Sequence, residues 1–486
     1  MVGLKNIDQN SAPLFEAVKK YIDDKVIPFH VPGHKHGRGI RELTEYVGEK
    51  ILQMDVNGMS DLDYFNNPIG VIYDAEKLFA DAYGAKETFF LVNGTTSGIQ
   101  AMIMSICKPN DEIILPRNAH KSAISGIILS GAMPIYIEPE ISEDLGIANG
   151  VTPEKVEAAI KSHPNAKAVF LVSPTYYGYT SDIQKIVEIA HNNNMKVLVD
   201  EAHGPHMYFH EDFPLTAIEQ GADMCAISMH KTGGSLTQSS VLLMGDTQIS
   251  AAEVKQALNL LFTSSASYLL MCSLDIARKQ MATEGRKLLQ NALELARWGR
   301  DELNKIDGIY AFGRELIGNP GCVDFDDTKL GINVRGLGYT GYQMETKLRR
   351  EYNIQIELAD LNNILAIISI GDRIEDIKAL VDSLKDISKK SQIKDYGKVN
   401  DLPKFSKTIV SPRKAYYMDK ELVKLSHSVD RIAGEMIMAY PPGIPILCIG
   451  ELITKEIIDY IDILKNQDCE LQGTSDTSVD YIKVLI

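Results

Sequence analysis

Short apolar runs alternate with helical patterns between residues 70 and 245. The apolar runs are continuous and show little alternation, which is typical of parallel strands buried on both faces of a sheet. Apolar residues at helical spacing fill the segments between them, and this order predicts right-handed crossovers in an α/β domain. We therefore expect a mostly parallel sheet with seven strands, at residues 88–92, 112–116, 134–138, 168–173, 196–202, 224–229 and 240–244.

The pattern changes outside this region. Gly, Pro and His are frequent before residue 70, long helices are expected between 250 and 310, and an α+β pattern follows around 320–385. The polar and charged stretch 385–412 is typical of a linker. We expect four parts: an N-terminal arm (1–70), a large domain (71–310), a small α+β domain (311–390), and a linker with a C-terminal domain (391–486).

Charge and cysteine usage exclude several classes of protein. The net charge of −15 argues against a nucleic-acid partner, because binding to phosphates needs clustered Lys and Arg. The acidic charge favours solubility, and it also suits long-range attraction of a cationic substrate. Six cysteines are scattered without a paired motif, as expected in a reducing compartment. Without a signal-peptide pattern or an apolar run of the ~20 residues that span a bilayer, we expect a soluble cytoplasmic protein with no membrane partner.

The segment SMHKTGGSLTQSS (228–240) places Lys231 where a predicted strand ends. A buried lysine is costly unless it is paired or reactive, and desolvation lowers its pKa and makes the amine nucleophilic toward carbonyl groups. Ser228 and His230, one strand step apart, are suited to hold an anion beside it. The alternative is an exposed lysine at the end of a strand.

Asp200 ends the apolar strand in VLVDEAHG (197–204). A buried carboxylate needs a cationic partner, and the protonated ring nitrogen of pyridoxal phosphate is such a partner. The pairing keeps the ring able to accept electrons. Ala202 lies two residues later, on the same face of an extended chain, and leaves room for a flat ring. The alternative is a structural Asp that caps the next helix.

Two further segments follow predicted strands. VNGTTSGIQAM (92–102) opens a helix with Gly and hydroxyl residues, so its backbone N–H groups, with Thr95 and Thr96, suit a phosphate. It lacks the Gly-Lys-Ser/Thr of nucleotide-binding loops. His120 in PRNAHKS (116–122) is suited to stack on a cofactor ring. Each segment alone also fits a structural role, as a capped helix or a satisfied histidine.

The segment HGPHMYFH (203–210) offers a rival interpretation as a metal site. Three histidines and two carboxylates have the residue types of metal ligands: His203, His206, His210, Asp200 and Glu201. Gly and Pro interrupt a regular helical face, and the His-Glu-x-x-His pattern is absent. We therefore expect no metal, and the His-rich stretch FHVPGHKHGRG (29–39) is equally ambiguous.

Four signals thus fall at the carboxyl ends of strands in one α/β domain, which is where open α/β sheets bind ligands. Their chain order is the phosphate loop, the stacking His120, the ring-nitrogen partner Asp200 and the reactive Lys231. Their joint occurrence by chance is much rarer than that of any one of them. The pattern predicts a pyridoxal-phosphate enzyme.

The sequence resembles, nearly from end to end, the short-form bacterial arginine decarboxylases of the Orn/Lys/Arg decarboxylase family. The segments that carry the resemblance are FHVPGHKHGRG, FFLVNGTTSG, PRNAHKSAISG, SPTYYG, VDEAHG, HKTGGSLTQSS, TSSASYLL and AYPPGIPILCIGE. The resemblance implies an aspartate-aminotransferase-like fold and a homodimer or higher homo-oligomer. It also implies that pyridoxal phosphate is bound covalently to Lys231, with Asp200 at the ring nitrogen and His120 stacked on the ring. The other cofactor-binding residues are expected to be Thr95, Thr96, Ser228 and His230 at the phosphate, with Ala202 and His203 nearby.

The expected reaction is decarboxylation of a basic amino acid, from L-arginine to agmatine and CO₂. Lysine decarboxylases share the pattern, so formation of cadaverine from lysine is one alternative, and an aminotransferase or lyase of the same fold is another. Inactive relatives commonly lose the cofactor lysine, whereas Lys231 is present. Candidate partners for the cationic end of the substrate are Asp63 and Glu451, with Asp61 as a further carboxylate.

Overall fold

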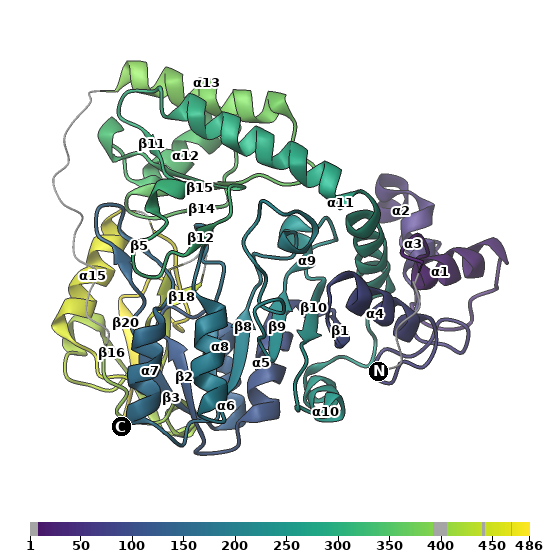
Figure 1. Cartoon of the computed structure of the whole chain (residues 1–486), viewed down its shortest axis with the longest axis horizontal. Coiled ribbons are helices and arrows are strands. Elements are labelled where there is room, and N and C mark those ends of the chain that lie inside the picture. The colour runs from purple at the N-terminus through teal and green to yellow at the C-terminus, as the bar shows by residue number, and fades with distance from the viewer. Residues whose placement is uncertain (1–7, 392–405, 440–442, 468) are drawn as a thin grey trace. The chain divides into compact units, whose positions relative to one another are not determined.

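The computed structural model describes residues 8–391, 406–439, 443–467 and 469–486 (Figure 1). Half of the predicted linker, residues 392–405, lies outside the described residues, as does the stretch 440–442 of the motif AYPPGIPILCIGE. The chain divides into two compact units, residues 1–105 with 200–289 and residues 106–199 with 290–486. The four-part domain division expected from the sequence stays a prediction.

In the first unit, three strands pair in antiparallel fashion. β10 (Ser240–Met244) pairs with β1 (Glu87–Leu91) and with β9 (Met224–Ile227). These strands are buried over nearly their whole length, which explains their continuous apolar sequence. The helices are α1 (Pro13–Asp23), α2 (Arg41–Val47), α3 (Glu49–Met54), α4 (Val71–Ala82), α5 (Gly94–Ile106), α9 (Met229–Thr232) and α10 (Ala251–Leu261), with a 3-10 turn at Met207–Phe209.

The second unit contributes parallel strands to the sheet that also contains β1, β9 and β10. β2 (Glu112–Pro116) pairs with β3 (Met133–Ile137) and with β6 (Ala168–Val172), and β8 (Lys196–Asp200) is the remaining strand. Helices follow in sequence between these strands: α6 (Lys121–Ser130), α7 (Pro153–Ser162) and α8 (Ile183–Asn192). Thr152 and Asp182 cap α7 and α8 by accepting backbone N–H groups, which satisfies donors that a helix start leaves unpaired.

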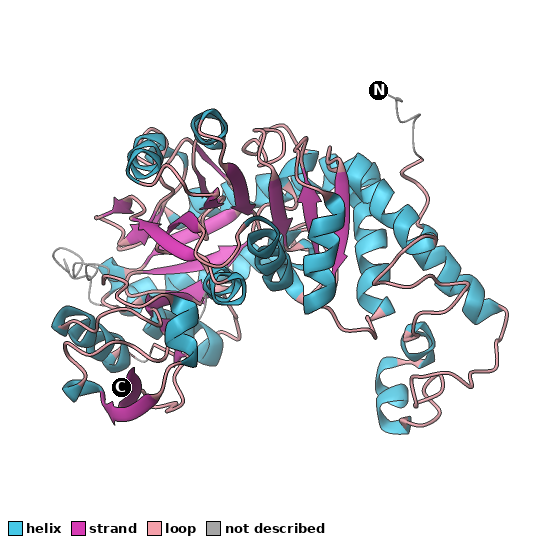
Figure 2. Cartoon of the chain, turned by 90° about the horizontal axis from the view of Figure 1, so that it is seen from below, coloured by secondary structure: helices cyan, strands magenta, loops and turns pink. Residues whose placement is uncertain are grey.

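The seven strands form one sheet with the order β1-β10-β9-β8-β6-β2-β3. Figure 2 shows its strands in magenta and the helices in cyan. The predicted α/β class with a mostly parallel seven-stranded sheet is therefore confirmed. Strands β2 and β10 have the predicted bounds, β1 and β3 begin and end one residue earlier than predicted, and β6 ends one residue earlier.

Three predicted boundaries are wrong. β8 ends at Asp200 instead of 202, and β9 ends at Ile227 instead of 229, because a turn and the short helix α9 follow them. The predicted linker begins too early, since α13 (Ile374–Lys390) continues through its first residues. Buried residues at helical spacing, among them Leu384 and Ile387, hold this end of α13 in the core.

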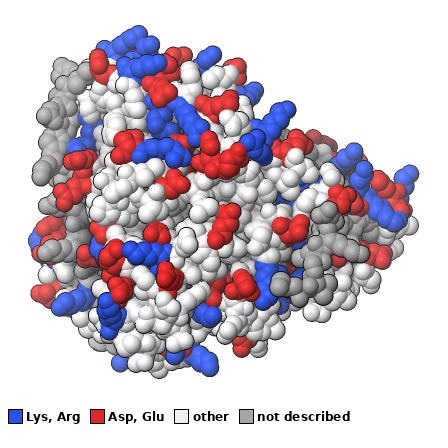
Figure 3. All heavy atoms as spheres, viewed as in Figure 1, with Lys and Arg blue, Asp and Glu red and all other residues white. Residues whose placement is uncertain are grey.

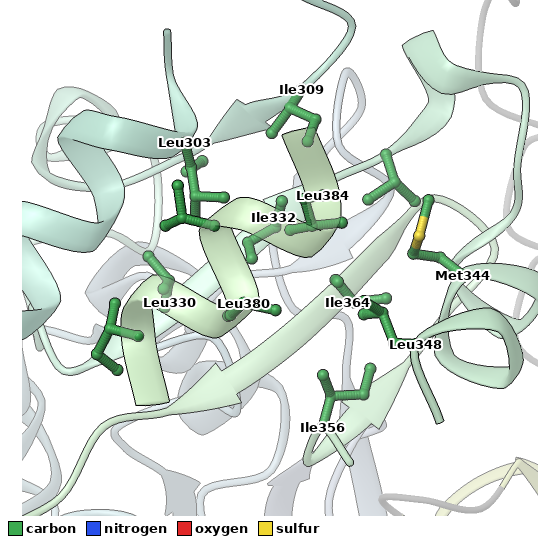
Figure 4. Close-up of a cluster of buried hydrophobic side chains, with 14 of the residues drawn as sticks. Leu303, Ile309, Leu330, Ile332, Met344, Leu348, Ile356, Ile364, Leu380 and Leu384 are labelled. Atoms are coloured by element: carbon green, nitrogen blue, oxygen red, sulfur yellow. The ribbon is translucent and has the colours of Figure 1, made fainter. Parts of the chain in front are cut away.

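A second sheet lies in the small α+β region, with the order β11 (Tyr310–Ala311), β13 (Lys329–Asn333), β15 (Asn363–Ile367) and β14 (Leu358–Ala359). Helices α12 (Gly341–Glu351) and α13 supply the other half of its core, together with the end of α11 (Tyr268–Leu303). Figure 4 shows Leu330 and Ile332 of β13 beside Leu380 and Leu384 of α13. The strand and helix patterns that alternate in residues 311–390 therefore belong to elements that pack around one apolar core.

The C-terminal region has a separate apolar core of its own. It contains α14 (Pro412–Tyr417), β16 (Lys420–Lys424), β17 (Ile437–Ala439), β18 (Ile444–Leu447), α15 (Lys455–Asn466), β19 (Leu471–Gln472) and β20 (Tyr481–Leu485), with a 3-10 turn at Leu425–His427. Shorter elements of the second unit are β4 (Ile141–Ser142), β5 (Ile147–Ala148), β7 (Tyr179–Thr180), β12 (Asp324–Phe325) and the 3-10 turns Arg314–Leu316 and Arg335–Leu337.

The face of the molecule in Figure 3 carries both signs of charge in close mixture. On the face shown in Figure 3, Lys and Arg are interspersed with Asp and Glu. Within the described parts of the chain, no helix is long and apolar enough to cross a membrane. The six cysteines are all buried and are free thiols.

Candidate active site

Lys231 lies on a short helix at the end of a buried strand. β9 ends at Ile227, and Ser228 precedes the single turn of α9. The backbone N–H of Lys231 donates to the carbonyl of Ser228 at 3.0 Å. Its Nζ lies 2.8 Å from Nε2 of His203, and the side chain is half-buried. The predicted strand-step relation of Ser228 and His230 is wrong, because His230 belongs to the helical turn and its Nδ1 lies 3.0 Å from the carbonyl oxygen of Ser239.

Asp200 is the last residue of β8, and its side chain is only 6% exposed. Its Oδ1 accepts the backbone N–H of Ala202 at 3.2 Å. Burial raises the pKa of Asp200 to about 6, and the nearby charge of Lys231 opposes that rise. A turn follows Asp200 where the capping alternative needed a helix. The carboxylate is therefore placed in an apolar setting where a cationic ring nitrogen stabilises its charged form.

Three buried hydroxyl groups meet at the start of α5. Thr95 Oγ1 lies 2.5 Å from Ser228 Oγ and donates to Ser240 Oγ at 3.0 Å. Gly94 begins the helix with φ +71°, a conformation that favours glycine, and its N–H donates to the carbonyl of Gln238 at 2.9 Å. Hydroxyl donors at a helix N-terminus suit a phosphate. Thr96 is exposed, so the structure brings only Thr95 of the predicted pair into this cluster.

Ser240 belongs to this cluster, although the sequence analysis missed it. It is the first residue of β10, and β10 runs antiparallel to β9. The start of β10 therefore lies beside the end of β9, where Ser228 stands. The useful signal would have been the direction of β10, which the apolar pattern of a buried strand does not reveal.

Two histidines contact consecutive residues of α9. His203 lies beside the Lys231 amine, as described above, and His206 Nδ1 lies 2.8 Å from Thr232 Oγ1. The rival metal site is not formed, since no three His, Cys, Asp or Glu side chains in the described ranges are grouped to hold a metal ion. His203 and His206 instead fix α9 against the segment that follows β8.

Glu201, the neighbour of Asp200, is a second buried carboxylate. The sequence suggested it only as a candidate metal ligand. It accepts the hydroxyl of Tyr208 at 2.5 Å, the N–H of Ala217 at 2.7 Å and the thiol of Cys225 at 3.4 Å. Burial raises the pKa of Glu201 to about 7, against these hydrogen bonds. The network anchors the chain immediately after β8 and so positions Asp200.

His120 lies in the second unit, at the N-cap of α6. Its Nδ1 accepts the backbone N–H of Ser122 at 3.2 Å and lies 2.8 Å from the Ser122 hydroxyl. These contacts fix the orientation of the imidazole ring. Stacking of His120 on a cofactor ring stays a prediction.

Glu451 is fully buried and forms a two-bond ion pair with Arg117. The Nε and Nη2 atoms of Arg117 donate to Oε1 at 3.0 Å and to Oε2 at 2.8 Å. The N–H of Cys448 also donates to Oε2, at 2.7 Å. A carboxylate held in this way has a structural partner inside its own chain. Contact between Glu451 and a substrate stays a prediction that this geometry does not favour.

Asp63 and Asp61 have contrasting surroundings. Asp63 is 4% exposed and accepts the backbone N–H groups of Tyr64, Ile69, Gly70 and Ile72. These bonds hold the loop before α4 and lower the pKa of Asp63, although burial opposes them. Asp61 is exposed. A substrate contact of Asp63 stays a prediction.

The first unit thus holds a set of groups that fits pyridoxal phosphate. Three hydroxyls at a helix start suit its phosphate, the buried Asp200 suits its ring nitrogen, and the Lys231 amine suits its carbonyl carbon. Ala202 is 9% exposed, and His203 and His230 complete the set.

Comparisons with known proteins identify a matching family and similar proteins. The family model described as Orn/Lys/Arg decarboxylase, major domain, matches residues 12–376, and the model of its C-terminal domain matches residues 400–477. The chain is 44% identical over 485 residues to an arginine decarboxylase of Bacillus subtilis (strain 168), with 99% of both chains covered. It is 43% identical to an arginine decarboxylase of Halalkalibacterium halodurans, with 98% of both covered.

A solved structure shares the fold at much lower identity. The lysine decarboxylase LdcF of Francisella novicida superposes with a TM-score of 0.84 at 20% identity, covering 98% of this chain and 81% of that one. At 20% identity, this superposition is evidence for a shared fold only.

Proposed function

The chain belongs to the Orn/Lys/Arg decarboxylase family, whose cofactor is pyridoxal phosphate, and we propose that it decarboxylates L-arginine to agmatine and CO₂. The observation that carries this proposal is the 44% identity to an arginine decarboxylase across 99% of both chains. The lysine decarboxylase of Francisella novicida shares the fold at only 20% identity. The bound cofactor supplies a conjugated ring that accepts the electron pair left behind when the carboxylate departs.

The residues of the first unit have distinct roles in this proposal. Lys231 would hold the cofactor through its Nζ. Asp200 keeps the ring nitrogen protonated, since a carboxylate buried in an apolar setting gains most from a cation at contact distance. Thr95, Ser228 and Ser240 orient the phosphate with hydroxyl donors. In the second unit, His120 is proposed to stack on the ring.

His203 is suited to handle the proton of Lys231. Its Nε2 lies 2.8 Å from Nζ, within reach for direct proton transfer. A lysine must be neutral before its nitrogen can attack a carbonyl carbon. We infer that His203 accepts this proton and returns it when the amine is released.

Arginine and lysine differ in the shape of their cationic ends. A guanidinium is a planar fork that carboxylates hold through two parallel bonds, whereas an ammonium is a compact point charge. A site shaped for the fork leaves acceptors unpaired when lysine binds, and such unpaired groups give discrimination of ~10⁴ or more. Decarboxylation of lysine is therefore the alternative, and a comparison of the two substrates on one enzyme distinguishes it from decarboxylation of arginine.

The test is kcat/KM for arginine, lysine and ornithine on one enzyme preparation, with amine and CO₂ measured together. The proposal expects arginine to be preferred and one amine to form per CO₂. A lysine value equal to that for arginine or above it would overturn the substrate assignment and leave the cofactor chemistry intact. Keto-acid formation without CO₂ would favour the aminotransferase alternative.

We further propose a homo-oligomeric enzyme of the cytoplasm. Large apolar side chains stay exposed in the arm and the loop before α4, including Ile27, Phe29, Tyr46 and Ile69. Clusters of this kind are typical of surfaces that a partner covers. The free thiols support a reducing compartment. Light scattering after gel filtration tests the assembly, and a monomeric mass at micromolar concentration would contradict it.

A further inference from the structure

A cavity of about 200 Å³ lies in the second unit, and none of the residues assigned to the cofactor lines it. Its lining residues lie in the loops that follow β2, β3 and β6, in the short strands β4 and β5, in α12 and β14, and in β17, β18 and α15. An apolar protein cavity of roughly 150 Å³ holds a benzene molecule. The volume here therefore suits a small organic molecule.

The walls combine apolar surface with phenol rings. Four tyrosines line the cavity, Tyr176, Tyr177, Tyr342 and Tyr460, beside apolar residues such as Ile147 and Leu358. The face of a phenol ring attracts a cation, and the attraction grows when water is excluded. Apolar walls favour methylene groups in the same ligand. The lining thus suits a slender molecule with an apolar body and a positive end.

Asp360 gives the cavity a negative charge. Among the lining residues that the structure describes, it is the only charged side chain. Its Oδ1 accepts the N–H groups of Asn362 and Asn363, both at 2.7 Å, and the Asn363 side-chain amide lies 3.0 Å from each oxygen. The Tyr177 hydroxyl also donates to Oδ2. All these donors are neutral, whereas buried carboxylates are usually balanced by a cation.

Tyr177 connects this charge to the cavity. The Tyr177 hydroxyl donates to Asp360, and a side-chain hydrogen bond from Asn363 occupies one acceptor site of the phenolic oxygen, which leaves the other for a donor inside the cavity. The neighbouring carboxylate polarises that oxygen and strengthens it as an acceptor. A ligand N–H group can therefore bind to Tyr177 while its charge is balanced by Asp360.

We propose that this cavity binds a small aliphatic cation, an amine or guanidine carried on a methylene chain. The choice among organic cations rests on the proposed function, since the product of that reaction belongs to this class. Every lining residue belongs to the second unit, whereas Lys231 and Asp200 belong to the first.

Calorimetric titration of the holoenzyme with putrescine tests the proposal, with 1,4-butanediol as the uncharged probe of the same chain length. Ala148→Phe fills the cavity from β5, and Ala252→Phe, at an exposed position of α10, is its control. Tyr460→Leu removes one phenol ring, and Tyr417→Leu, at a side chain that is 74% exposed, is its control.

The expected result is a putrescine site that weakens at least tenfold in both cavity variants, stays in both controls and ignores butanediol. Arginine turnover by Ala148→Phe is expected to equal that of the wild type. Unchanged putrescine binding in both cavity variants, or equal binding of butanediol, would overturn the inference. Arginine turnover in the same preparation tests the proposed function separately, because cavity binding in a protein inactive toward arginine would leave this inference standing.

Discussion

Asp200 and Glu451 are both buried carboxylates, but their surroundings are opposite. Glu451 faces the guanidinium of Arg117 through two bonds and accepts a backbone N–H group as well. Asp200 accepts one backbone N–H group, and the charge of Lys231 only partly offsets its burial. The chain therefore neutralises Glu451 by itself, whereas we propose that Asp200 gains its full counter-charge from the bound cofactor.

We interpret this difference as the one between a structural carboxylate and a functional one. The Arg117–Glu451 pair holds the segment 445–451 against the end of β2, since Arg117 also donates to the carbonyl of Pro445 at 2.8 Å. Asp200 stands at the edge of the sheet where ligands of α/β folds bind. The partners of a buried charge thus indicate its role better than the burial itself.

Asp200→Asn is expected to have the largest effect. The amide keeps the shape of the side chain but cannot keep the ring nitrogen protonated. A loss of ~4 kcal/mol of transition-state stabilisation lowers kcat about a thousandfold. Steady-state kinetics at full cofactor occupancy measure this, and a decrease of less than tenfold would make Asp200 a structural residue like Glu451.

Glu451→Gln is expected to affect stability instead of chemistry. It leaves the Arg117 guanidinium buried without a counter-charge, which costs about 3 kcal/mol of unfolding free energy. Glu421→Gln, which breaks the exposed pair with Arg431, is the matched control and should cost under ~1 kcal/mol. Denaturant unfolding measures both. An unchanged stability combined with a raised KM for arginine would instead place Glu451 at the substrate.

The raised pKa of Asp200 predicts a pH dependence of the apoprotein. The unfolded carboxyl ionises near pH 3.8 and the folded one near pH 6, so the folded state binds the extra proton between these values. Stability of wild type relative to Asp200→Asn therefore falls by about 3 kcal/mol as pH rises from 4 to 6, and is flat above. Bound cofactor should abolish this fall. Unfolding curves of both proteins across this pH range measure this difference in stability. A rise with pH in the stability of the wild type relative to Asp200→Asn would contradict the raised pKa of Asp200.

His203→Phe is expected to have the smallest effect. It removes the acceptor beside Lys231 Nζ, and loss of a hydrogen bond of about 1.5 kcal/mol lowers kcat/KM about tenfold. His203→Gln keeps an acceptor and should recover part of the activity, while His427→Phe, at an exposed position, should change nothing. The pH profile of kcat/KM is the discriminating readout. Loss of a purely structural histidine would lower activity without shifting the acid limb of that profile.

The sequence predicted the strands and the positions of Lys231 and Asp200 because buried parallel strands are continuous apolar runs and their ends are marked by polar residues. It could not reveal that β10 runs antiparallel, and Ser240 was missed for that reason. The partner of Glu451 was also hidden, since Arg117 lies 334 residues away in the chain. Local patterns determine elements, whereas pairings over such separations depend on tertiary packing.

Mapping the lysine that carries the cofactor tests the central claim most directly. Borohydride reduction fixes the cofactor to its lysine, and trypsin does not cleave after a modified lysine. Between Lys196 and Lys255, Lys231 is the only lysine or arginine. The account predicts one labelled tryptic peptide spanning residues 197–255, and its absence from Lys231→Ala. A label on any other lysine of the wild-type protein would contradict the assignment of the site.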